Sequence, residues 1–488
     1  MGNTRRREIL FTVDAASAQP LYRQVYEQAR DAIVEGRLHA GERLPSIRKL
    51  ATTLSLSHTT IEQAYLQLSV EGYVRNVPRS GYMVERLDTK FLRLPKMSNT
   101  EASVQRALDS RNTDAFAFEN AAGGKARYDF SYANLPADSF PANTWRKIVA
   151  DVLYAHTAPE LAAYAYTHEP SPLRRQLAAH LARTRGVNCV ADQVVPQAGT
   201  DGALATVLSL FDPHTHVFGM EEPGYATAIE VARRMGFTLS ALPSDQGTDA
   251  FISSLDKKRP KVVFCTPSHQ FPTGAVMPLE ARTRLLQWAQ AHNAYIVEDD
   301  SCNEYRYDTA PIPSLQSLDA YHRVVYLGNV SKVLSPALRV AYLVLPPKLL
   351  GRYLRLFNYA HPPIPYLEQE VLARFMEQGL WDAHVRRMAH AMHKRHDALL
   401  ACLEDAMGDH LEISGKHAGM HFYVGVDNGM DQEELVAAAQ REGAAVYSTR
   451  RMWFSHRKPA QRVMVGFSSI PPEDIPAGVA ALKRAWLG

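Results

Sequence analysis

The stretch GNVSKVLSPALRVAY, residues 328–342, comes directly after the apolar run VVYL at residues 324–327. A short apolar run that ends in small and polar residues indicates a strand buried on both faces of a sheet. Lys332 would then lie just beyond the end of this strand, and Arg339 follows seven residues later. A lysine amine in such a place can attack a carbonyl carbon, and an arginine can bind a phosphate. The stretch therefore predicts both a strand end and a reactive site.

Similar apolar runs recur from residue 128 onward and alternate with segments of helical periodicity. Over this length, the alternation predicts an α/β fold with a mainly parallel sheet covered by helices on both faces. In such sheets the functional groups gather at the carboxyl ends of the strands. The apolar runs are residues 194–196, 217–219, 261–265, 295–297 and 324–327, and the helical segments include residues 203–211 and 226–235.

Length and composition bound the class of protein. The 488 residues suffice for about two to four domains, and a hydrophobic content of 46% supports packed cores. The 54 Lys and Arg residues nearly balance the 51 Asp and Glu residues, so the net charge of +3 does not by itself indicate a nucleic-acid partner. No apolar run approaches the roughly 18 residues of a membrane helix, and no signal peptide is evident. We expect a soluble, cytoplasmic protein with no membrane partner.

The cysteines indicate neither a metal site nor a disulfide framework. Cys189, Cys265, Cys302 and Cys402 are far apart and form no CxxC pair. The chain also lacks an HExxH pattern or a similar metal-ligand spacing. We therefore expect no bound metal.

The first 87 residues carry a different pattern. Apolar residues with helical spacing predict three short helices, and Ser57 is a suitable N-cap for the third. Two short apolar runs around a Pro-Arg-Ser-Gly turn then predict a hairpin. Together the helices and the hairpin form a candidate winged helix-turn-helix. Any small three-helix unit shows such spacing, so the pattern alone leaves open whether the unit binds DNA or is only structural. The helices are expected over residues 21–33, 47–54 and 57–68, and the hairpin over residues 73–84.

A winged helix-turn-helix binds DNA in a known way. The start of the third helix enters the major groove, while the wing tip and the second helix reach phosphates or the minor groove. The residues that we expect to contact DNA are Arg48, Ser57, His58, Thr59, Thr60, Gln63, Arg79, Ser80 and Gly81.

The segment LPSIRKLATTLSLSHTTIEQAYLQLSVEGYV, residues 44–74, followed by RSGYMV, resembles the GntR superfamily of bacterial regulators. In this resemblance Arg48 matches the DNA-contacting arginine of the family, whereas His58 stands where members often have arginine. The resemblance implies a DNA-binding domain over residues 15–87 that recognises an operator. Residues 88–125 are polar and small, which favours a linker.

Four predicted strand ends in the body carry groups of complementary chemistry. A helix opens with a Gly-Thr-Asp step that could bind a phosphate, an aromatic residue could face a flat ring, and an aspartate could hold a ring nitrogen. Together with a lysine and an arginine, these are the groups that pyridoxal phosphate (PLP) requires. The residues that we expect to bind the cofactor are Gly199, Thr200, Asp201, Tyr225, Asp299, Ser331, Lys332 and Arg339.

The order of these groups resembles the fold type I aminotransferases, and the joined head and body resemble the MocR regulators. The matching segments are EEPGYATA, TPSHQFPTGAVMP, VEDDSCNEYRY, SKVLSPALRVAYLV and HAGMHFYV, all within residues 221–424. The resemblance implies that Lys332 forms the Schiff base, Asp299 contacts the pyridine nitrogen and Arg339 binds the phosphate. It further implies a homodimer and an aminotransferase-like domain over residues 126–488, with a smaller α+β subdomain from about residue 370 to 488.

The chain departs from the fold type I pattern at three places. Phe271 replaces the asparagine that usually bonds the 3-oxygen of the cofactor, and Ser301 replaces a tyrosine of the MocR pattern, for which Tyr305 or Asn303 are candidate substitutes. Alignment on Gly466-Phe467 places Met464 where an arginine usually binds the substrate carboxylate. Arg462, on the same face of that strand, is the alternative, because a guanidinium grips a carboxylate with two hydrogen bonds. The candidate effector-binding residues are Arg462, Gln270 and His269.

These features favour a PLP-dependent transcription regulator that binds operator DNA and senses a small amine or amino acid. No residue is assigned a confirmed catalytic role. Two alternatives stay open: an active PLP-dependent aminotransferase with an appended DNA-binding domain, and a regulator that senses PLP itself.

Overall fold

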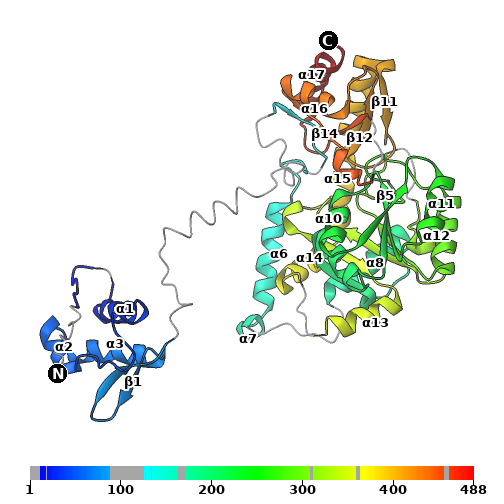
Figure 1. Cartoon of the computed structure of the whole chain (residues 1–488). Coiled ribbons are helices and arrows are strands. Elements are labelled where there is room, and N and C mark those ends of the chain that lie inside the picture. The colour runs from blue at the N-terminus through cyan, green and yellow to red at the C-terminus, as the bar shows by residue number, and fades with distance from the viewer. Residues whose placement is uncertain are drawn as a thin grey trace. The chain divides into compact units, whose positions relative to one another are not determined.

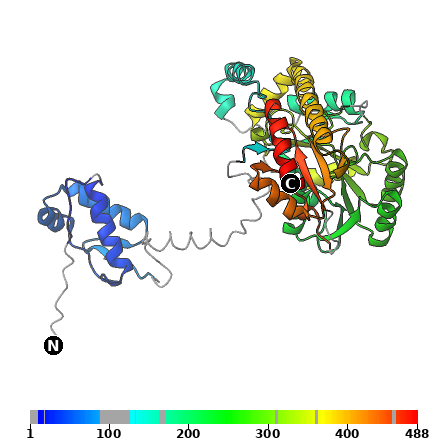
Figure 2. The ribbon, with the colours of Figure 1, turned by 90° about the horizontal axis from the view of Figure 1, so that it is seen from above.

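The chain divides into two compact units, Met1–Thr113 and Asp114–Gly488, which are shown in Figures 1 and 2. No described helix is both long enough and apolar enough to cross a membrane. The linker expected over residues 88–125 lies outside the described residues. The computed structural model describes residues 11–17, 19–87, 126–132, 134–162, 171–307, 312–358, 363–455 and 461–488.

The described residues of the N-terminal unit form three helices and an antiparallel hairpin, as the apolar spacing predicts (Figure 1). Its core consists of the apolar faces of the helices and of the hairpin, including Val25, Ile33, Ile61, Tyr65 and Leu68. The elements are α1 (Leu21–Val34), α2 (Ile47–Leu54), α3 (His58–Val70), β1 (Val74–Val77) and β2 (Gly81–Val84).

Local signals position α2 and α3. The Ser46 hydroxyl accepts a hydrogen bond from the Lys49 amide at 3.2 Å, and the Ser57 hydroxyl accepts one from the Thr60 amide at 3.1 Å. Between the helices, Ser55 adopts a left-handed conformation with φ of 57°, which ends α2 within one residue. The predicted N-cap of the third helix is therefore confirmed.

The body is built on a seven-stranded sheet of order β4-β10-β9-β8-β7-β5-β6. All neighbouring pairs are parallel except those of β10, which runs antiparallel to both β4 and β9. The mainly parallel sheet predicted from the alternating pattern is thus confirmed. Its strands are β4 (Val194–Ala198), β5 (Val217–Glu222), β6 (Thr238–Pro243), β7 (Val262–Cys265), β8 (Tyr295–Asp299), β9 (Val324–Asn329) and β10 (Val340–Val344).

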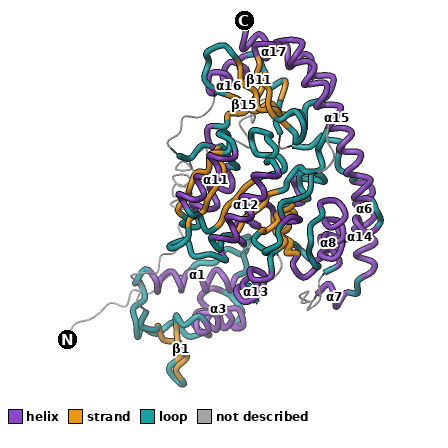
Figure 3. The backbone as a smooth tube through the Cα atoms, turned by 90° about the vertical axis from the view of Figure 1, so that its right-hand side faces the viewer, coloured by secondary structure: helices purple, strands orange, loops and turns teal. Residues whose placement is uncertain are grey.

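Helices cover both faces of this sheet (Figure 3). On β9, Val325 and Leu327 join the core beneath α9, α10 and α13, while Tyr326 joins the core on the opposite face. Burial on both faces explains why the strand sequences are continuously apolar. The helices of one face are α9 (Gly199–Ser209), α10 (Ala226–Arg234) and α13 (Pro347–Leu356); those of the other include α6 (Ala142–Ala155), α8 (Pro172–Arg185), α11 (Thr248–Lys258), α12 (Leu279–Ala291) and α14 (Tyr366–Glu377).

The C-terminal part forms a smaller antiparallel sheet of order β11-β12-β15-β14, on which helices pack. The short strand β3 (Tyr128–Asp129) pairs in parallel with β13 (Ala444–Ala445), so the start of the body also joins this part. The remaining elements are α7 (Ala158–Ala162), α15 (Leu380–Met407), β11 (Leu411–Ser414), β12 (His421–Val426), α16 (Gln432–Arg441), β14 (Tyr447–Ser448), β15 (Arg462–Gly466) and α17 (Ile475–Leu487).

A buried ion pair secures the carboxyl end of β8. Arg185, the last residue of α8, donates from Nε to Asp300 Oδ2 at 2.7 Å and from Nη2 to Asp300 Oδ1 at 3.0 Å. The hydroxyl of Tyr326 donates to the same carboxylate at 2.8 Å, and Arg185 also donates to the Ser268 hydroxyl at 3.0 Å. One guanidinium thus connects α8 to the segments that follow β7 and β8.

Replacing Asp300 with asparagine should destabilise the body, because Arg185 would remain buried without its anion. Loss of one partner of a buried pair costs about 3 kcal/mol or more, so the unfolding temperature should fall by several degrees. Tryptophan fluorescence measures this transition, since all five tryptophans lie beyond residue 126. The matched variant D249N breaks the exposed pair with Arg284 and should leave the unfolding temperature unchanged; an equal loss in both variants would contradict the prediction.

Candidate ligand pocket and DNA-contact surface

A pocket lies where the carboxyl ends of β7, β8 and β9 meet the segment before β12. It therefore joins the large sheet to the smaller C-terminal sheet. Of the predicted cofactor residues, Thr200, Tyr225, Asp299 and Lys332 come together in its wall. The other residues of the wall are Tyr132, Thr266, His269, Phe271, Ser301, Cys302, Asn329, Gly419, Met420 and His421.

Asp299 is the last residue of β8 and points into the pocket, whereas its neighbours Glu298 and Asp300 bind groups elsewhere. The amide and the hydroxyl of Ser301 both donate to Asp299 Oδ1, at 3.0 and 2.5 Å. Burial raises the pKa of Asp299 to about 6, although the Ser301 bonds lower it. The carboxylate is thus held by one oxygen, and the second can accept a proton from a ligand.

Lys332 lies three residues beyond β9, at the strand end that the sequence predicts. Its backbone oxygen accepts a hydrogen bond from the Tyr305 hydroxyl at 3.0 Å. Its Nζ lies 5.1 Å from the centre of the Tyr132 ring, a distance that favours a cation over the face of an aromatic ring. The amine is therefore presented to the pocket from a fixed turn.

Thr200 and Asn329 form a polar corner of the pocket. Asn329 Nδ2 donates to Thr200 Oγ1 at 2.9 Å, and Asn329 Oδ1 accepts from the Ser331 amide at 2.6 Å. Because the threonine oxygen already accepts a bond, its own hydrogen is available to donate to an anion. The predicted residue Ser331 is buried and its hydroxyl donates to the Val340 carbonyl at 3.4 Å, so its side chain faces away from the pocket.

Gly199, Asp201 and Arg339 form a contact group beside Thr200, outside the pocket wall itself. Gly199 has a φ of 77°, and a Cβ atom at this position would lie 2.7 Å from Arg339 Nη2. Only glycine therefore lets the guanidinium approach the start of α9. Arg339 pairs with the Asp201 carboxylate, so Asp201 can offer an anion its backbone N–H but not its side chain.

Tyr225 and Phe271 supply aromatic surface. The Tyr225 ring is stacked on Phe264 at 6.4 Å between ring centres and meets Phe271 edge-on at 5.9 Å. Burial raises the pKa of the Tyr225 hydroxyl to about 12, so it stays protonated. Phe271 has no polar group to replace the asparagine that usually stands there.

Two histidines lie side by side in the wall, with ring centres 5.8 Å apart. Neither ring nitrogen of His269 has a hydrogen-bond partner among the described residues, although the side chain is buried. His421 bonds through Nε2 to the Pro272 carbonyl at 2.8 Å. Burial lowers the pKa of His269 to about 3 and that of His421 to about 4, so both rings are neutral at pH 7.

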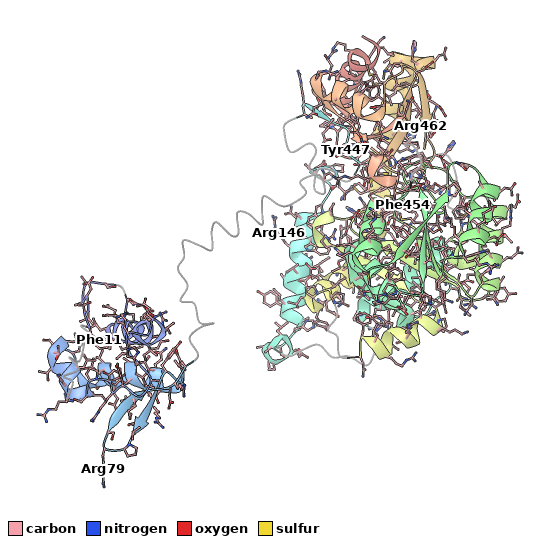
Figure 4. All side chains as sticks on the ribbon, in the orientation of Figure 1. Phe11, Arg79, Arg146, Tyr447, Phe454 and Arg462 are labelled. Carbon is pink, nitrogen blue, oxygen red and sulfur yellow. The ribbon has the colours of Figure 1, made fainter. Side chains whose placement is uncertain are left out.

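Two predicted effector residues are not brought to the pocket. The Gln270 amide is bound to the Pro223 and Phe271 carbonyls and to Thr273. Arg462 lies on β15 in the smaller sheet (Figure 4), where it pairs with Glu412 and donates to the Ser414 hydroxyl at 3.0 Å. Both side chains have partners elsewhere in the body.

The substitutes considered for Ser301 also lie elsewhere. The Tyr305 side chain is fully buried and bonds to the backbone of Lys332, and the Asn303 amide donates to the Asp300 carbonyl at 2.7 Å. Ser301 itself donates two hydrogen bonds to the Asp299 carboxylate. Neither Tyr305 nor Asn303 therefore takes the place of the tyrosine that the MocR pattern has at position 301.

Sequence reasoning missed several pocket residues. Asn329 was not predicted, although a polar residue closing an apolar strand was a usable signal. Tyr132 lies about two hundred residues before Lys332 in the sequence, and no local pattern connects the two. Met420 and Cys302 lie in matched segments but have no distinctive chemistry.

The predicted DNA-contact residues lie on the expected elements of the N-terminal unit. Arg48 is exposed on α2, and Ser57 to Thr60 form the start of α3 with Gln63 exposed one turn later. Arg79, Ser80 and Gly81 form the hairpin turn, and Arg79 extends from its tip (Figure 4). Among the described residues, no group of three or more His, Cys, Asp or Glu side chains could hold a metal ion.

Comparisons with known proteins match each unit to a family. Residues 130–482 match aminotransferase class I and II, and residues 21–84 match the bacterial regulatory proteins of the gntR family. The uncharacterized HTH-type transcriptional regulator YdeL of Bacillus subtilis is 33% identical over 469 residues, which cover 96% of this chain and 97% of that protein. The probable rhizopine catabolism regulatory protein MocR of Rhizobium meliloti is 32% identical over 484 residues, 98% of this chain and 96% of that protein.

Among solved structures, LysN, the α-aminoadipate aminotransferase of Thermus thermophilus, was crystallised with N-(5'-phosphopyridoxyl)-L-leucine. It matches with a TM-score of 0.65 at 27% identity, over 74% of this chain and 92% of that chain.

Pyridoxal phosphate is the cofactor of this aminotransferase family, and the residues present fit it. The pocket offers an amine, a buried carboxylate with one oxygen available, an aromatic ring, and a threonine hydroxyl at a helix start beside an arginine. These groups match an aldehyde, a ring nitrogen, a flat ring and a phosphate. With both units matched over their main elements, the chain belongs to the MocR-type transcription regulators, in which a gntR-family helix-turn-helix region precedes a class I and II aminotransferase domain.

Proposed function

We propose that the chain binds operator DNA through residues 15–87 and changes its DNA binding when a small amine or amino acid reacts at Lys332. The observation that carries this proposal is the convergence of Thr200, Tyr225, Asp299 and Lys332 on one pocket, in a chain that also has a gntR-type head. In this proposal residues 88–125 link the head to the body at residues 126–488, and the protein acts as a cytoplasmic homodimer.

The roles of Lys332 and Asp299 follow from their positions. Bound pyridoxal phosphate supplies an aldehyde that reacts with amines and a ring that withdraws electrons when its nitrogen is protonated. Lys332 Nζ would hold the aldehyde carbon, and Asp299 would accept a hydrogen bond from the ring nitrogen through Oδ2, because Ser301 donates to Oδ1. A positively charged ring nitrogen also stabilises the ionised form of Asp299, which burial alone disfavours.

A different set of residues would hold the phosphate of the cofactor. The Thr200 hydroxyl hydrogen and the first free N–H groups of α9 can donate to an anion, and Arg339 lies against Gly199 at the same helix start. The Asp201 carboxylate competes for this guanidinium. A bound phosphate must therefore share Arg339 with Asp201 or displace it.

The regulatory step depends on which groups the ligand contacts. An amine that took the place of Lys332 would free the lysine side chain and would bring a new substituent into the pocket lined by Phe271 and His421. Such a ligand shifts the equilibrium between two arrangements of the body only by its difference in affinity for them. The heads would then be repositioned on DNA through the linker.

The second candidate function is that of an aminotransferase, which the same converging groups favour. Sustained turnover requires an amino donor and a keto acid to bind in alternation, each with a carboxylate. Arg462 is paired with Glu412, and Phe271 and Ser301 remove two usual contacts to the cofactor. Measuring keto-acid formation with 2-oxoglutarate over many turnovers separates the two candidates, and sustained turnover would favour the enzyme.

Replacing Lys332 with alanine should abolish stable attachment of the cofactor, because its amine is the group that holds the aldehyde carbon. After incubation with pyridoxal phosphate and treatment with borohydride, mass spectrometry of the peptides should find the added mass on the Lys332 peptide of the wild-type chain. The K332A variant should carry none.

The matched control is Lys348→Ala, which removes an exposed lysine at the start of α13. This variant should keep the label on Lys332. Label at another lysine, or none in the wild-type chain, would reject the assigned role of Lys332.

Replacing Arg48 with alanine should weaken binding to DNA fragments selected by the wild-type protein by about tenfold. The reason is that Arg48 is exposed on α2, where a winged helix-turn-helix contacts the DNA backbone. Binding is measured by fluorescence anisotropy at several salt concentrations. The slope of the logarithm of the binding constant against the logarithm of the salt concentration should decrease in magnitude by about one, because one phosphate contact is lost.

The control for Arg48 is Arg37→Ala. Arg37 is an exposed arginine of the same unit that pairs with Glu35 at 2.8 Å. Equal weakening by R37A and R48A would show a general charge effect and would remove Arg48 from the proposed interface.

A further inference from the structure

Resting on the function proposed above, we propose that the pocket selects a primary amine that carries an aromatic or other apolar group and no carboxylate. An arylalkylamine such as 2-phenylethylamine belongs to this class. An α-amino acid with the same side chain does not.

The wall around Lys332 is largely aromatic. The centre of the Tyr132 ring lies 5.2 Å from that of Phe271 and 5.6 Å from that of His421. The ring centres of Phe271 and His421 are 5.4 Å apart. Together with Met420, these rings form a continuous apolar surface in the pocket wall. A ligand gains affinity here by burying apolar surface.

A second apolar layer lies behind this wall. Tyr423, Tyr447, Met452 and Met464 form a buried cluster, against which Tyr132 and Phe271 pack. Met464 on β15 stands opposite both Tyr423 and Tyr447 and is fully buried. Met464 therefore places a thioether in the layer that supports the wall, while the Arg462 guanidinium lies over the Tyr423 ring of this layer, 5.6 Å from its centre.

The described part of the pocket wall offers no spare cation to a ligand carboxylate. Of the described residues in the pocket wall, Lys332 is the one Lys or Arg, and its amine is used by the cofactor or the ligand. Arg462 is committed to Glu412, and Arg339 to Asp201 and the phosphate.

The remaining polar groups also disfavour an anion. His269 and His421 are both neutral at pH 7, because burial lowers the pKa of each well below that value. The pocket wall already contains the carboxyl group of Asp299, and a second one, that of Glu221, is buried behind Thr266. A second carboxylate would be desolvated without a counter-charge, which is costly. His269, whose ring nitrogens have no described partner, can still bond to a neutral polar group.

The test uses the full-length protein loaded with pyridoxal phosphate and three probes: 2-phenylethylamine, phenylalanine and methylamine. The change in the visible absorbance of the bound cofactor measures binding, and the anisotropy of labelled DNA provides a second readout. We expect 2-phenylethylamine to half-saturate the change at a concentration at least about tenfold lower than either other probe, a difference that corresponds to about 1.4 kcal/mol. Phenylalanine binding as well as 2-phenylethylamine would overturn the exclusion of the carboxylate, and methylamine binding as well would overturn the apolar preference.

Substitution of Met464 gives an independent test. Met464→Arg should improve phenylalanine binding and weaken 2-phenylethylamine binding, because it adds a cation to the layer behind Phe271. Met464→Leu keeps that layer apolar and should retain the wild-type order of the probes. If M464R fails to fold, as its unfolding curve would show, the comparison of the three probes on the wild-type protein decides the proposal.

Failure of this inference is distinguishable from failure of the proposed function. If the borohydride experiment finds no cofactor on Lys332, the proposed function fails. If the cofactor is attached there but no probe changes its absorbance, the attachment stands and the inference about the ligand class is overturned.

Discussion

The buried contact between Arg185 and Asp300 is the constraint on which the pocket depends. Successive residues of a strand point to opposite faces, so the face on which Asp300 is anchored decides where Asp299 points. Arg185 holds both oxygens of Asp300, and Tyr326 donates to one of them. The same guanidinium bonds to Ser268, one residue before His269. A single buried cation thereby positions the acid of the pocket and the segment that carries its histidine and aromatic wall.

The electrostatics of the pocket follow from burial. Burial raises the pKa of Asp299 to about 6 and that of Glu221 to about 7. A carboxyl group whose pKa is raised by folding contributes fully to the free energy of unfolding at low pH. This contribution is lost as the pH rises through the pKa of the folded state. At pH 7 the carboxylate of Asp299 is thus a cost to the protein without its ligand, and a cationic ring nitrogen offsets it. Because the two histidines are neutral, this site is suited to one positive charge and poorly suited to an additional negative one.

Local patterns predicted the parts of this structure that depend on neighbouring residues. The strand at residues 324–327, the Ser57 cap and the helix that begins at Gly199 each had a signal within a few positions. Elements defined by distant contacts were beyond such reasoning: nothing near β10 shows that it runs antiparallel between β4 and β9, and nothing near Arg185 shows its partner 115 residues away. For Arg462, the sequence predicted the strand and the face on which the side chain lies, but it did not predict the ion pair with Glu412.

The position of the pocket explains how a small ligand could affect the whole body. Asp299 and Lys332 follow strands of the large sheet, whereas Met420 and His421 belong to the smaller sheet and the loop before it. The two parts also meet at Glu222, the last residue of β5, which accepts hydrogen bonds from the Phe454 and Ser455 amides at 2.7 Å each. A ligand bound between them contacts both parts, so its affinity must change with their spacing. A ligand can shift the equilibrium between two arrangements only if its affinity for them differs, and this dependence on spacing supplies such a difference. Because the pocket wall is apolar on both sides, the size of the difference is set by how much apolar surface the ligand buries in each arrangement.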